Sequence, residues 1–302
     1  MRRSSVHFRE ATAADRERIL ALRARCFGDV DPEKLDPRFW EWEFARSRMF
    51  TGAAGGEEDD ELATHLALLT LPHMLDGAEV PGALAVDAMT SPSARGQGAF
   101  TGVVSEAVKR SGHVVATAYQ IRSAVLGAML RGGWAVAGRA PVLLRPAFTF
   151  RREAALPLLQ RGDIGWMSEL GGDDGCIART PEFLSWRFFD NPRWTYRVTG
   201  IRGEAYLVTR RTRLKGLDTL AVVDLAWRNR RTAARLLRNA IAHARAQRCT
   251  LVAAFASRRH PAFGMLLRAG FLPGPHWFRL LVHPREHAAR PWRVMWADTD
   301  HL

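Results

Sequence analysis

The most informative residues lie in the segment Ala85–Lys109, AVDAMTSPSARGQGAFTGVVSEAVK. Its pattern predicts a strand, then the turn Arg95-Gly96-Gln97-Gly98, then a helix. Glycines directly before a helix let the backbone approach a phosphate, and the free N–H groups of the first helical turn, with the positive end of the helix dipole, hold that anion. Two familiar nucleotide loops are excluded, because neither GxGxxG after a buried strand nor GxxxxGK[ST] occurs here. The segment therefore predicts a pyrophosphate site of another kind.

An internal repeat indicates which elements position this turn. It consists of three matches in chain order: Pro37–Phe44 with Pro181–Phe188, Val86-Asp87 with Val223-Asp224, and Gly127–Trp134 with Gly264–Phe271. The first match has an offset of 144 residues and the other two have an offset of 137. The difference requires an insertion in the first half between the matches, and the polar, acidic stretch 52–61, GAAGGEEDDE, indicates such an inserted loop. Three ordered matches favour a duplication over chance similarity, with domains at 1–150 and 151–302.

Each half predicts a similar order of elements. In the first half these are strands at 6–9, 65–75, 79–90, 113–119, 134–137 and 142–150 and helices at 15–27, 37–48, 99–110 and 123–131, with Asp76-Gly77 as a hairpin turn. In the second half they are strands at 196–200, 204–211, 219–227 and 250–256, a helix at 229–247 and a helix ending at 268. Hairpins followed by βαβ units predict the α+β class, with a mixed, partly parallel sheet flanked by helices.

Composition bounds the class of protein. A chain of 302 residues with 47% hydrophobic and 25% charged residues can bury one or two cores and does not resemble a disordered chain. The three cysteines have no CxxC spacing and no apolar run of about 18 residues occurs, so we expect a soluble cytoplasmic protein without a metal site. The formal net charge of +13 lies in the second half, because 1–150 holds 18 basic and 18 acidic residues and 151–302 holds 26 and 13.

The glycine turn and its flanks resemble the GNAT N-acetyltransferase superfamily, whose signature here is Arg/Gln-x-x-Gly-x-Gly/Ala. Arg95 and Gly98 match it, whereas Phe100 stands where the family has a small residue and is expected to face the core. The following strand, short helix and Gly133-Trp134 match the closing motif of the family. With the repeat, the chain resembles a tandem-GNAT protein over nearly its whole length.

The resemblance implies a binding site for an acyl-CoA, most simply acetyl-CoA, in the first half. The residues that would hold the pyrophosphate are Arg95, Gly96, Gln97, Gly98, Ala99, Phe100 and Thr101, and those that would pair with the pantetheine are Ala88, Met89 and Thr90, where the next strand should diverge. In the repeat, the turn aligns with Thr232–Arg235 (TAAR), which has lost both glycines. We therefore expect one cofactor site and a second, degenerate GNAT-like domain on the acceptor side.

Acyl transfer to an amine needs a base, donors for the oxyanion and a proton for the departing thiolate. The helix tyrosine that many GNAT enzymes use as the acid is replaced here by Met129. Tyr119 is the first candidate for the acid, with a core tyrosine as the alternative, and Ser123 is either a contact of the thiol or a helix N-cap. Asp87 is the candidate base, but Asp224 recurs in the half without the turn, so pairing of both with an arginine is the alternative.

Three further groups stay open. His65 and His73, on the preceding strand, are either structural or reach the cleft. The chain end 296–302 (WADTDHL) is either a disordered tail or, as in some tandem-GNAT enzymes that it resembles, part of the site. The arginines of the helix at 229–247 form one stripe, which is typical of a solvated charged face.

Together these features predict an enzyme that transfers an acetyl group from acetyl-CoA to a small-molecule amine by direct attack. No membrane is implied, a nucleic-acid partner is not expected, and no oligomeric state is indicated. One alternative is a Fem-type transferase that takes an aminoacyl group from tRNA through the basic second half, which the glycine turn disfavours. The other is a non-catalytic acyl-CoA-binding or interaction protein, which the missing tyrosine and Phe100 leave open.

Overall fold

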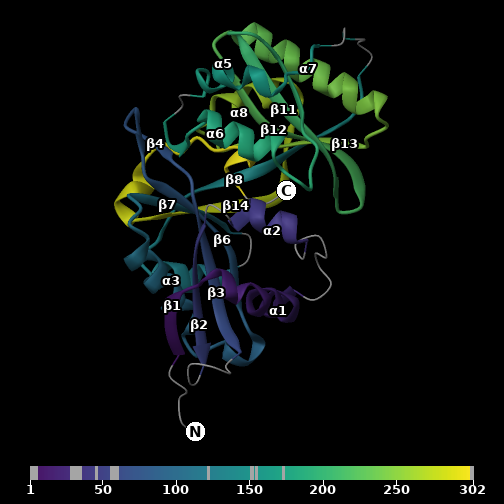
Figure 1. Cartoon of the computed structure of the whole chain (residues 1–302). Coiled ribbons are helices and arrows are strands. Elements are labelled where there is room, and N and C mark those ends of the chain that lie inside the picture. Colours follow the sequence, from purple (N-terminus) through teal and green to yellow (C-terminus); the bar gives the residue numbers. More distant parts are fainter. Residues whose placement is uncertain are drawn as a thin grey trace. The chain divides into compact units, whose positions relative to one another are not determined.

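The computed structural model describes residues 6–27, 36–44, 47–54, 61–120, 123–149, 153, 156–171 and 174–299 (Figure 1). The chain forms two compact units, and neither is one continuous segment. Unit 1 consists of Met1–Pro72, Val80–Ala137 and Leu280–Ala289, and unit 2 of His73–Glu79, Gly138–Arg279 and Arg290–Leu302. We expected one boundary at residue 150, whereas the chain changes units inside three of its strands and places the tip of the first hairpin in unit 2.

Unit 1 contains a mixed sheet. Its strands are β1 (Val6–Glu10), β2 (Ser47–Ala54), β3 (Leu62–Thr70), β6 (Gly82–Thr90), β7 (Val115–Gln120) and the end of β14 (Leu272–His283), in the order β1-β2-β3-β6-β7-β14. The pairs from β1 to β6 are antiparallel, and β6 pairs with β7 in parallel. The predicted class is thus confirmed. β2 was not predicted, because the expected helix ran to residue 48 and the expected loop began at residue 52.

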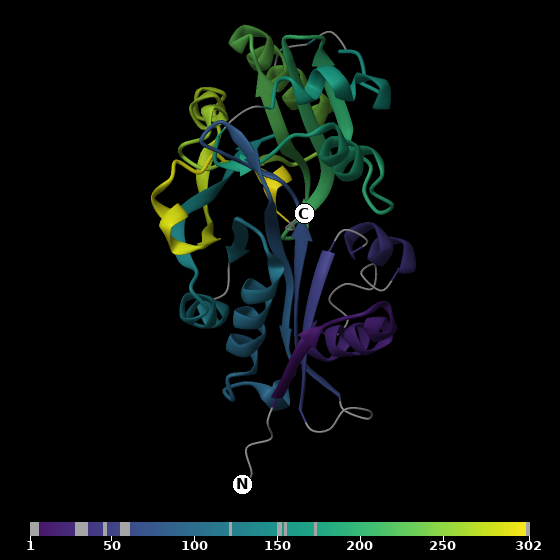
Figure 2. The ribbon, with the colours of Figure 1, turned by 60° about the vertical axis from the view of Figure 1, so that its left-hand side comes forward.

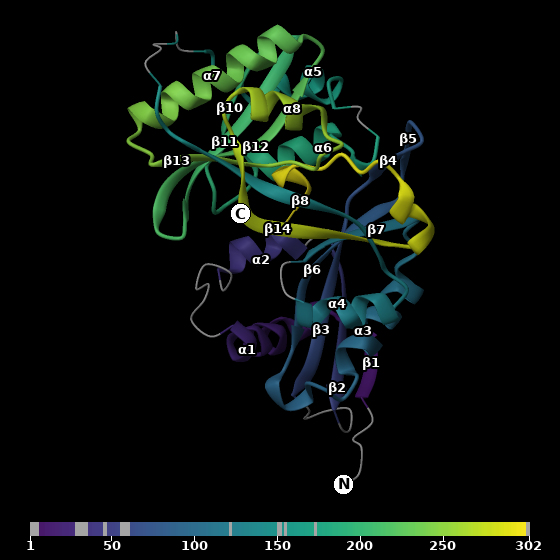
Figure 3. The ribbon, with the colours of Figure 1, turned by 180° about the vertical axis from the view of Figure 1, so that it is seen from behind.

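Helices cover both faces of this sheet. The helices are α1 (Arg16–Phe27), α2 (Pro37–Phe44), α3 (Ala99–Ser111) and α4 (Ser123–Arg131), with short 3-10 turns η1 (Ala13–Asp15) and η4 (Pro92–Ala94). Figure 2 shows α1 and α2, in purple, on one face and α3 on the other, and Figure 3 shows α4 beside α3. Val103, Val104 and Ala107 of α3 pack against the sheet, and Leu281 of β14 belongs to the same core. The last strand of the chain is therefore part of the core of unit 1.

Unit 2 has a sheet of similar construction. Its strands are β8 (Ala135–Pro146), β10 (Arg197–Ile201), β11 (Ala205–Leu214), β12 (Leu217–Trp227) and β13 (Leu251–Phe255), in the order β8-β13-β12-β11-β10, and a small sheet is formed by β5 (Ala78–Val80), β4 (His73–Leu75) and β9 (Cys176–Ile177). Its helices are α5 (Ile164–Ser168), α6 (Pro181–Leu184), α7 (Arg230–Ala246) and α8 (Pro261–Arg268), with the 3-10 turns η5 (Arg161–Asp163) and η8 (Trp296–Asp298) and the π-helical segment η6 (Ser185–Phe189). A further 3-10 turn, η7 (Arg285–Ala289), belongs to unit 1. The succession β10, β11, β12, α7, β13, α8 repeats that of β2, β3, β6, α3, β7, α4, as the sequence repeat predicts.

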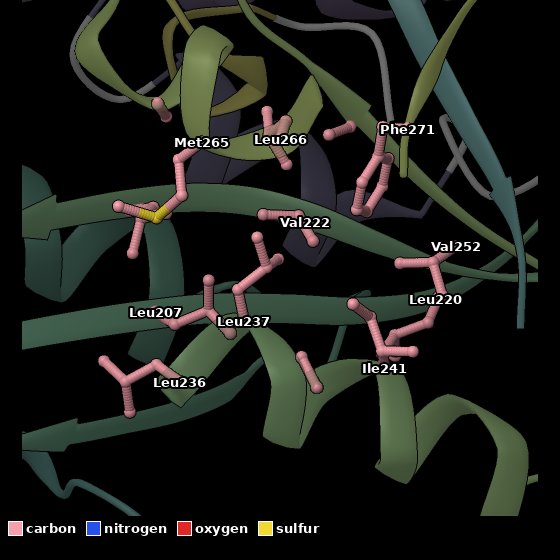
Figure 4. Packing of buried hydrophobic residues seen from close by; sticks show 14 of the residues in the cluster. Leu207, Leu220, Val222, Leu236, Leu237, Ile241, Val252, Met265, Leu266 and Phe271 are labelled. Atoms are coloured by element: carbon pink, nitrogen blue, oxygen red, sulfur yellow. The ribbon is translucent and has the colours of Figure 1, made fainter. Parts of the chain in front are cut away.

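The amphipathic helix α7 packs on the core of unit 2. Figure 4 shows Leu236, Leu237 and Ile241 of α7 among Leu207, Leu220 and Val222 of β11 and β12. Arginines 231, 235, 238 and 245 are exposed, so the predicted arginine stripe is confirmed as a solvated face. Among the described helices, none combines the length and the apolar character that crossing a bilayer requires.

Candidate functional site

The glycine turn directly precedes α3, as predicted. Gly96 and Gly98 have φ angles of 76° and 85°, which glycine adopts without the steric cost that other residues have. Gly98 is the N-cap residue of α3, so no side chain caps this helix, and a Cβ added to either glycine would meet no atom within 4 Å. The main-chain N–H groups of the first turn of α3 therefore face a space that an anion can enter.

A cavity of about 840 Å³ adjoins this turn in unit 1. It is lined by Cys26, Phe27, Ala88, Met89, Thr90, Ala94, Arg95, Gly96, Gly98, Ala99, Phe100, Thr101, Gly102, Ser105, Val125, Ala128 and Arg131. Nine of the ten predicted cofactor residues belong to this lining. The exception is Gln97, whose side-chain Nε2 donates to the main-chain oxygen of Ser93 at 2.7 Å. Phe100 also packs on the core of unit 1, as its bulk led us to expect.

The cavity is suited to a negatively charged ligand. Its described lining contains two arginines and no acidic residue. Arg131 reaches from α4 to the start of α3, where its Nη2 lies 3.4 Å from Thr101 Oγ1, and Arg95 is exposed beside the turn. Two guanidinium groups and the N-terminus of α3 together provide the donors and the positive potential that a pyrophosphate requires.

The strand edge beside the cavity has the predicted divergence. The parallel pairing of β6 with β7 covers Gly82–Leu84 and Val115–Thr117 and does not continue to Ala88–Thr90. On the opposite side, the carbonyl of Met89 accepts from Thr64 Oγ1 at 2.8 Å. The Cys26 thiol donates to the carbonyl of Thr90 at 3.2 Å, and burial raises the pKa of this thiol. Main-chain groups of β6 on the β7 side are thus left for an extended ligand.

Sequence reasoning missed the walls of the cavity that come from other elements. Val125, Ala128 and Arg131 recur at three-residue steps and form one face of α4, a signal that helical periodicity contained. Ser105 likewise lies one helical turn after Thr101. No local signal points to Cys26 and Phe27, because only the packing of α1 on the sheet brings them to β6.

Asp87 occupies a bulge of β6. Because Ala67 pairs with Val86 and His65 with Met89, two residues of β6 face one residue of β3. The buried Asp87 Oδ1 accepts from Arg23 Nε at 3.2 Å and lies 2.6 Å from Arg23 Nη2 in an ion pair, and Oδ2 lies 3.6 Å from Nε2 of His65. Asp87 is not part of the cavity lining.

Its counterpart in unit 2, Asp224, has the same kind of partner. Arg179 donates to both oxygens of Asp224, at 2.9 and 3.0 Å, and the Tyr206 hydroxyl donates to Oδ2 at 2.9 Å. Pairing of both aspartates with an arginine, the alternative to catalysis, is thus confirmed.

Neither predicted histidine lines the cavity. His65 is fully buried, and burial lowers its pKa to about 4, so that the ring is neutral at pH 7. His73 belongs to unit 2, where its ring centroid lies 6.3 Å from that of Trp292. Both histidines are therefore buried away from the lining of the cavity.

Tyr119 and Ser123 are the remaining predicted catalytic residues. Tyr119 on β7 is 3% exposed and does not line the cavity. Ser123 is the first residue of α4, and its side chain lies outside the described residues. In the described part of the chain, no three His, Cys, Asp or Glu side chains gather as a metal site would require.

The chain end is not a disordered tail as far as Thr299. Asp298 is fully buried and pairs with Arg179 at 2.7 Å, which keeps the pKa of its carboxyl below the ordinary value although burial opposes this. The interpretation as a disordered tail is therefore wrong for Trp296–Thr299. Residues 300–302 lie outside the described residues.

The corresponding segment of unit 2 cannot hold an anion in the same way. Thr232–Arg235 lies within α7, which already starts at Arg230. The side chain of Asn229 caps this helix by accepting from the N–H groups of Arg231 and Thr232, at 3.0 and 3.4 Å. Two first-turn N–H groups of α7 are thus already hydrogen-bonded to a side chain, whereas no side chain caps α3.

Known proteins share the fold of this chain and the sequence pattern of its first part. Residues 7–127 match the family model of the acetyltransferase (GNAT) domain. The fold is similar to that of a GCN5-related N-acetyltransferase from Anabaena variabilis (17% identity, 92% of this chain and 72% of that chain, TM-score 0.68). It is also similar to a probable N-acyltransferase from Enterococcus faecalis (10%, 94% and 74%, 0.69) and to N-myristoyltransferase from Saccharomyces cerevisiae with bound myristoyl-CoA (12%, 92% and 79%, 0.62). No curated protein matches the sequence.

Proposed function

Because residues 7–127 match the acetyltransferase (GNAT) domain family, we propose that unit 1 binds an acyl-CoA and transfers its acyl group, most simply acetyl, to an amine of a small molecule. The observation that carries the proposal is the cavity at the N-terminus of α3, where the N-cap residue Gly98 has no side chain to occupy the first-turn N–H groups. A neutral ligand would gain little from this arrangement, whereas a pyrophosphate uses all of it.

The residues around the cavity fit coenzyme A in three parts. The N–H groups from Gly98 to Thr101 would bind the pyrophosphate, and Arg95 and Arg131 would contact phosphate oxygens. The main chain of Ala88–Thr90, which β7 leaves unpaired, would pair with the amides of the pantetheine. These assignments place the thioester beyond the end of the pantetheine, along β6.

The reaction that this arrangement supports is a direct acyl transfer. The amine nitrogen attacks the thioester carbonyl, the C–N bond forms and the C–S bond breaks, and the amine proton is lost while the CoA thiolate gains a proton. The thiolate needs little help to leave, since a thiol has a pKa of about 8.5. Tyr119 and Ser123 remain the proposed contacts of the sulfur.

We further propose that unit 2 is a degenerate GNAT-like repeat of unit 1 without a cofactor of its own. The shared succession of elements and the paired aspartates support a duplication, and the Asn229 cap of α7 opposes a second pyrophosphate site. We also propose that the protein acts in a reducing cytoplasm. Free thiols support this, at Cys26, Cys176 and Cys249.

Thermal unfolding with and without ligand tests the proposal. Acetyl-CoA at about 100 times its Kd should stabilise the protein by about 2.7 kcal/mol, because it binds the folded state alone. Gly98→Glu, which places a carboxylate at the N-terminus of α3, should abolish this stabilisation. Arg235→Glu is the matched control, since it changes an exposed residue in the corresponding segment of α7 and should leave the effect intact.

The other functions are distinguished in the same experiment. Stabilisation by aminoacyl-tRNA but by no CoA would refute the proposal in favour of a Fem-type transferase. If acyl-CoA binds, the acceptor and the acyl chain are identified by incubating the protein with acyl-CoAs and a panel of amines and measuring the mass increase of each amine. If no amine is acylated, the protein is an acyl-CoA-binding protein without this transferase activity. In that assay, unchanged turnover of Tyr119→Phe would remove Tyr119 from the acid role.

A further inference from the structure

Asp87 lies where β6 departs from regular strand geometry, directly before the residues that line the cavity. Its φ angle is 53°, in the left-handed region that glycine favours and that aspartate and asparagine visit more readily than alanine does. Asp87 and Ala88 together face Leu66 alone, so that the strand bulges at this point. Because a bulge re-aims the residues that follow it, the conformation of Asp87 determines how the main chain from Ala88 to Thr90 faces the cavity.

A buried arginine holds this conformation through the side chain. Arg23 of α1 donates to Asp87 Oδ1 and is itself 3% exposed. Its guanidinium carbon lies 6.0 Å from the ring centroid of Trp40 and 5.8 Å from that of Phe44, and its Nη2 lies 3.9 Å from Glu43 Oε2. The arginine is therefore fixed by α1 and α2, and the carboxylate cannot turn into the cavity without breaking a buried charge pair.

In unit 2 the same kind of ion pair occurs without the left-handed conformation. Asp224 is also paired with a buried arginine, Arg179, at 2.9 Å, but its φ is not positive. The two arginines come from different places, since Arg23 lies on α1 and Arg179 precedes α6. The left-handed aspartate thus occurs in the unit whose strand lines the cavity, and the ion pair alone does not account for it.

We infer that Asp87 is a positioning residue, held by Arg23 in a left-handed conformation so that the main chain of Ala88–Thr90 presents its polar groups to the acyl-CoA, and that it is not the general base. This inference rests on the proposed acyl-CoA site. If the inference is correct, the reaction depends on the backbone conformation of residue 87 and not on its carboxylate.

Substitutions at position 87 test this directly, because glycine, asparagine and alanine differ in their access to positive φ. Titration calorimetry with CoA gives the Kd, and turnover is measured as kcat and KM against pH. Asp87→Ala should weaken CoA binding by about tenfold, because alanine is strained at this φ. Asp87→Gly should bind CoA nearly as the wild type does and should keep most of its turnover, with the acid limb of the pH–rate profile still present.

Two further variants control for folding. Asp224→Ala removes the equivalent carboxylate of unit 2 and should lower Tm without changing the Kd for CoA. Arg18→Lys changes another arginine of α1, one that pairs with Asp15 and not with Asp87, and it should stay folded with a Kd close to that of the wild type. If Asp87→Gly does not fold, Asp87→Asn replaces it in the comparison with Asp87→Ala, since asparagine also tolerates positive φ.

The outcomes are distinct. If all substitutions at position 87 bind CoA equally well but lose turnover and the acid limb of the pH–rate profile, Asp87 is a general base and the inference is overturned. Equal weakening of CoA binding by glycine, asparagine and alanine would also overturn it, because conformation would then not matter. A wild-type protein that does not bind CoA would instead refute the proposed function.

Discussion

Acidification from pH 7.5 to pH 5 should destabilise unit 1 in part through His65. This side chain is fully buried on β3, and burial lowers its pKa to about 4 in the folded protein. In the unfolded chain the pKa of a histidine is about 6.5. Between these two values the unfolded chain binds a proton that the folded protein does not bind, so the free energy of unfolding decreases as the pH falls from about 6.5 towards about 4.

The size of this effect follows from the two pKa values. The full difference of about 2.5 units corresponds to about 3 kcal/mol, which is reached only below pH 4. At pH 5 the unfolded histidine is almost fully protonated and the folded one is still mostly neutral, which leaves a loss of about 2 kcal/mol. Asp87, 3.6 Å away, favours the proton, and the buried Arg23 opposes it, so neither partner reverses the direction set by burial.

Urea unfolding of the wild type and of His65→Gln at the two pH values measures this contribution. The variant cannot take up the proton, so its free energy of unfolding should fall by about 2 kcal/mol less than that of the wild type between pH 7.5 and pH 5. His7→Gln, at an exposed position of β1, is the matched control and should retain the loss of the wild type. Equal losses in the wild type and in His65→Gln would refute the reasoning, because His65 would then titrate alike in both states.

Two further predictions concern the packing of glycines in unit 1 and a buried ion pair in unit 2. Gly102→Ala should lower stability by about 1–3 kcal/mol, because a Cβ there would lie 2.1 Å from the ring of Phe8, whereas Gly127→Ala, whose Cβ would meet only the flexible end of a side chain at 3.5 Å, should leave Tm unchanged or higher. Equal Tm values for the two variants would contradict this. Asp298→Ala should destabilise unit 2 by about 3–5 kcal/mol, because it removes one of the two carboxylates that pair with the buried Arg179. A wild-type Tm for this variant would show that the segment before the C-terminus does not stabilise unit 2.

The part of the site that the sequence predicted is the part formed by one continuous segment. Gly96 and Gly98 are recognisable because a positive φ before a helix restricts the residue type, and the cavity follows the segment from Ala88 to Thr101. Cys26 and Phe27, which close the cavity from α1, were missed because their contribution depends on how α1 packs on the sheet. The bulge at Asp87 also has no sequence signal, since an aspartate stands where glycine would have revealed it.

The assignment of strands to units was beyond the sequence for a similar reason. Alternation of apolar residues indicated strands near 134–150, but a strand pattern does not say which sheet the strand joins. β8 pairs with β13 in unit 2, and Leu281 at the end of β14 lies in the core of unit 1. The single boundary at residue 150 assumed that each half of the sequence folds on itself, and the repeat alone could not test that assumption.

The net charge of +13 is a poor guide to where an anion binds in this protein. The favourable field of a helix N-terminus falls off within the first turn, so only groups at that turn decide whether it holds a phosphate. In α3 these groups are a glycine N-cap and two arginines, in the half of the sequence that has no net charge. A stripe of arginines runs along the exposed face of α7. At the N-terminus of this helix, however, the side chain of Asn229 already accepts from the N–H groups of Arg231 and Thr232. A cofactor phosphate is therefore expected where the local donors are uncapped, and adding positive charge to α7 should not create a second site.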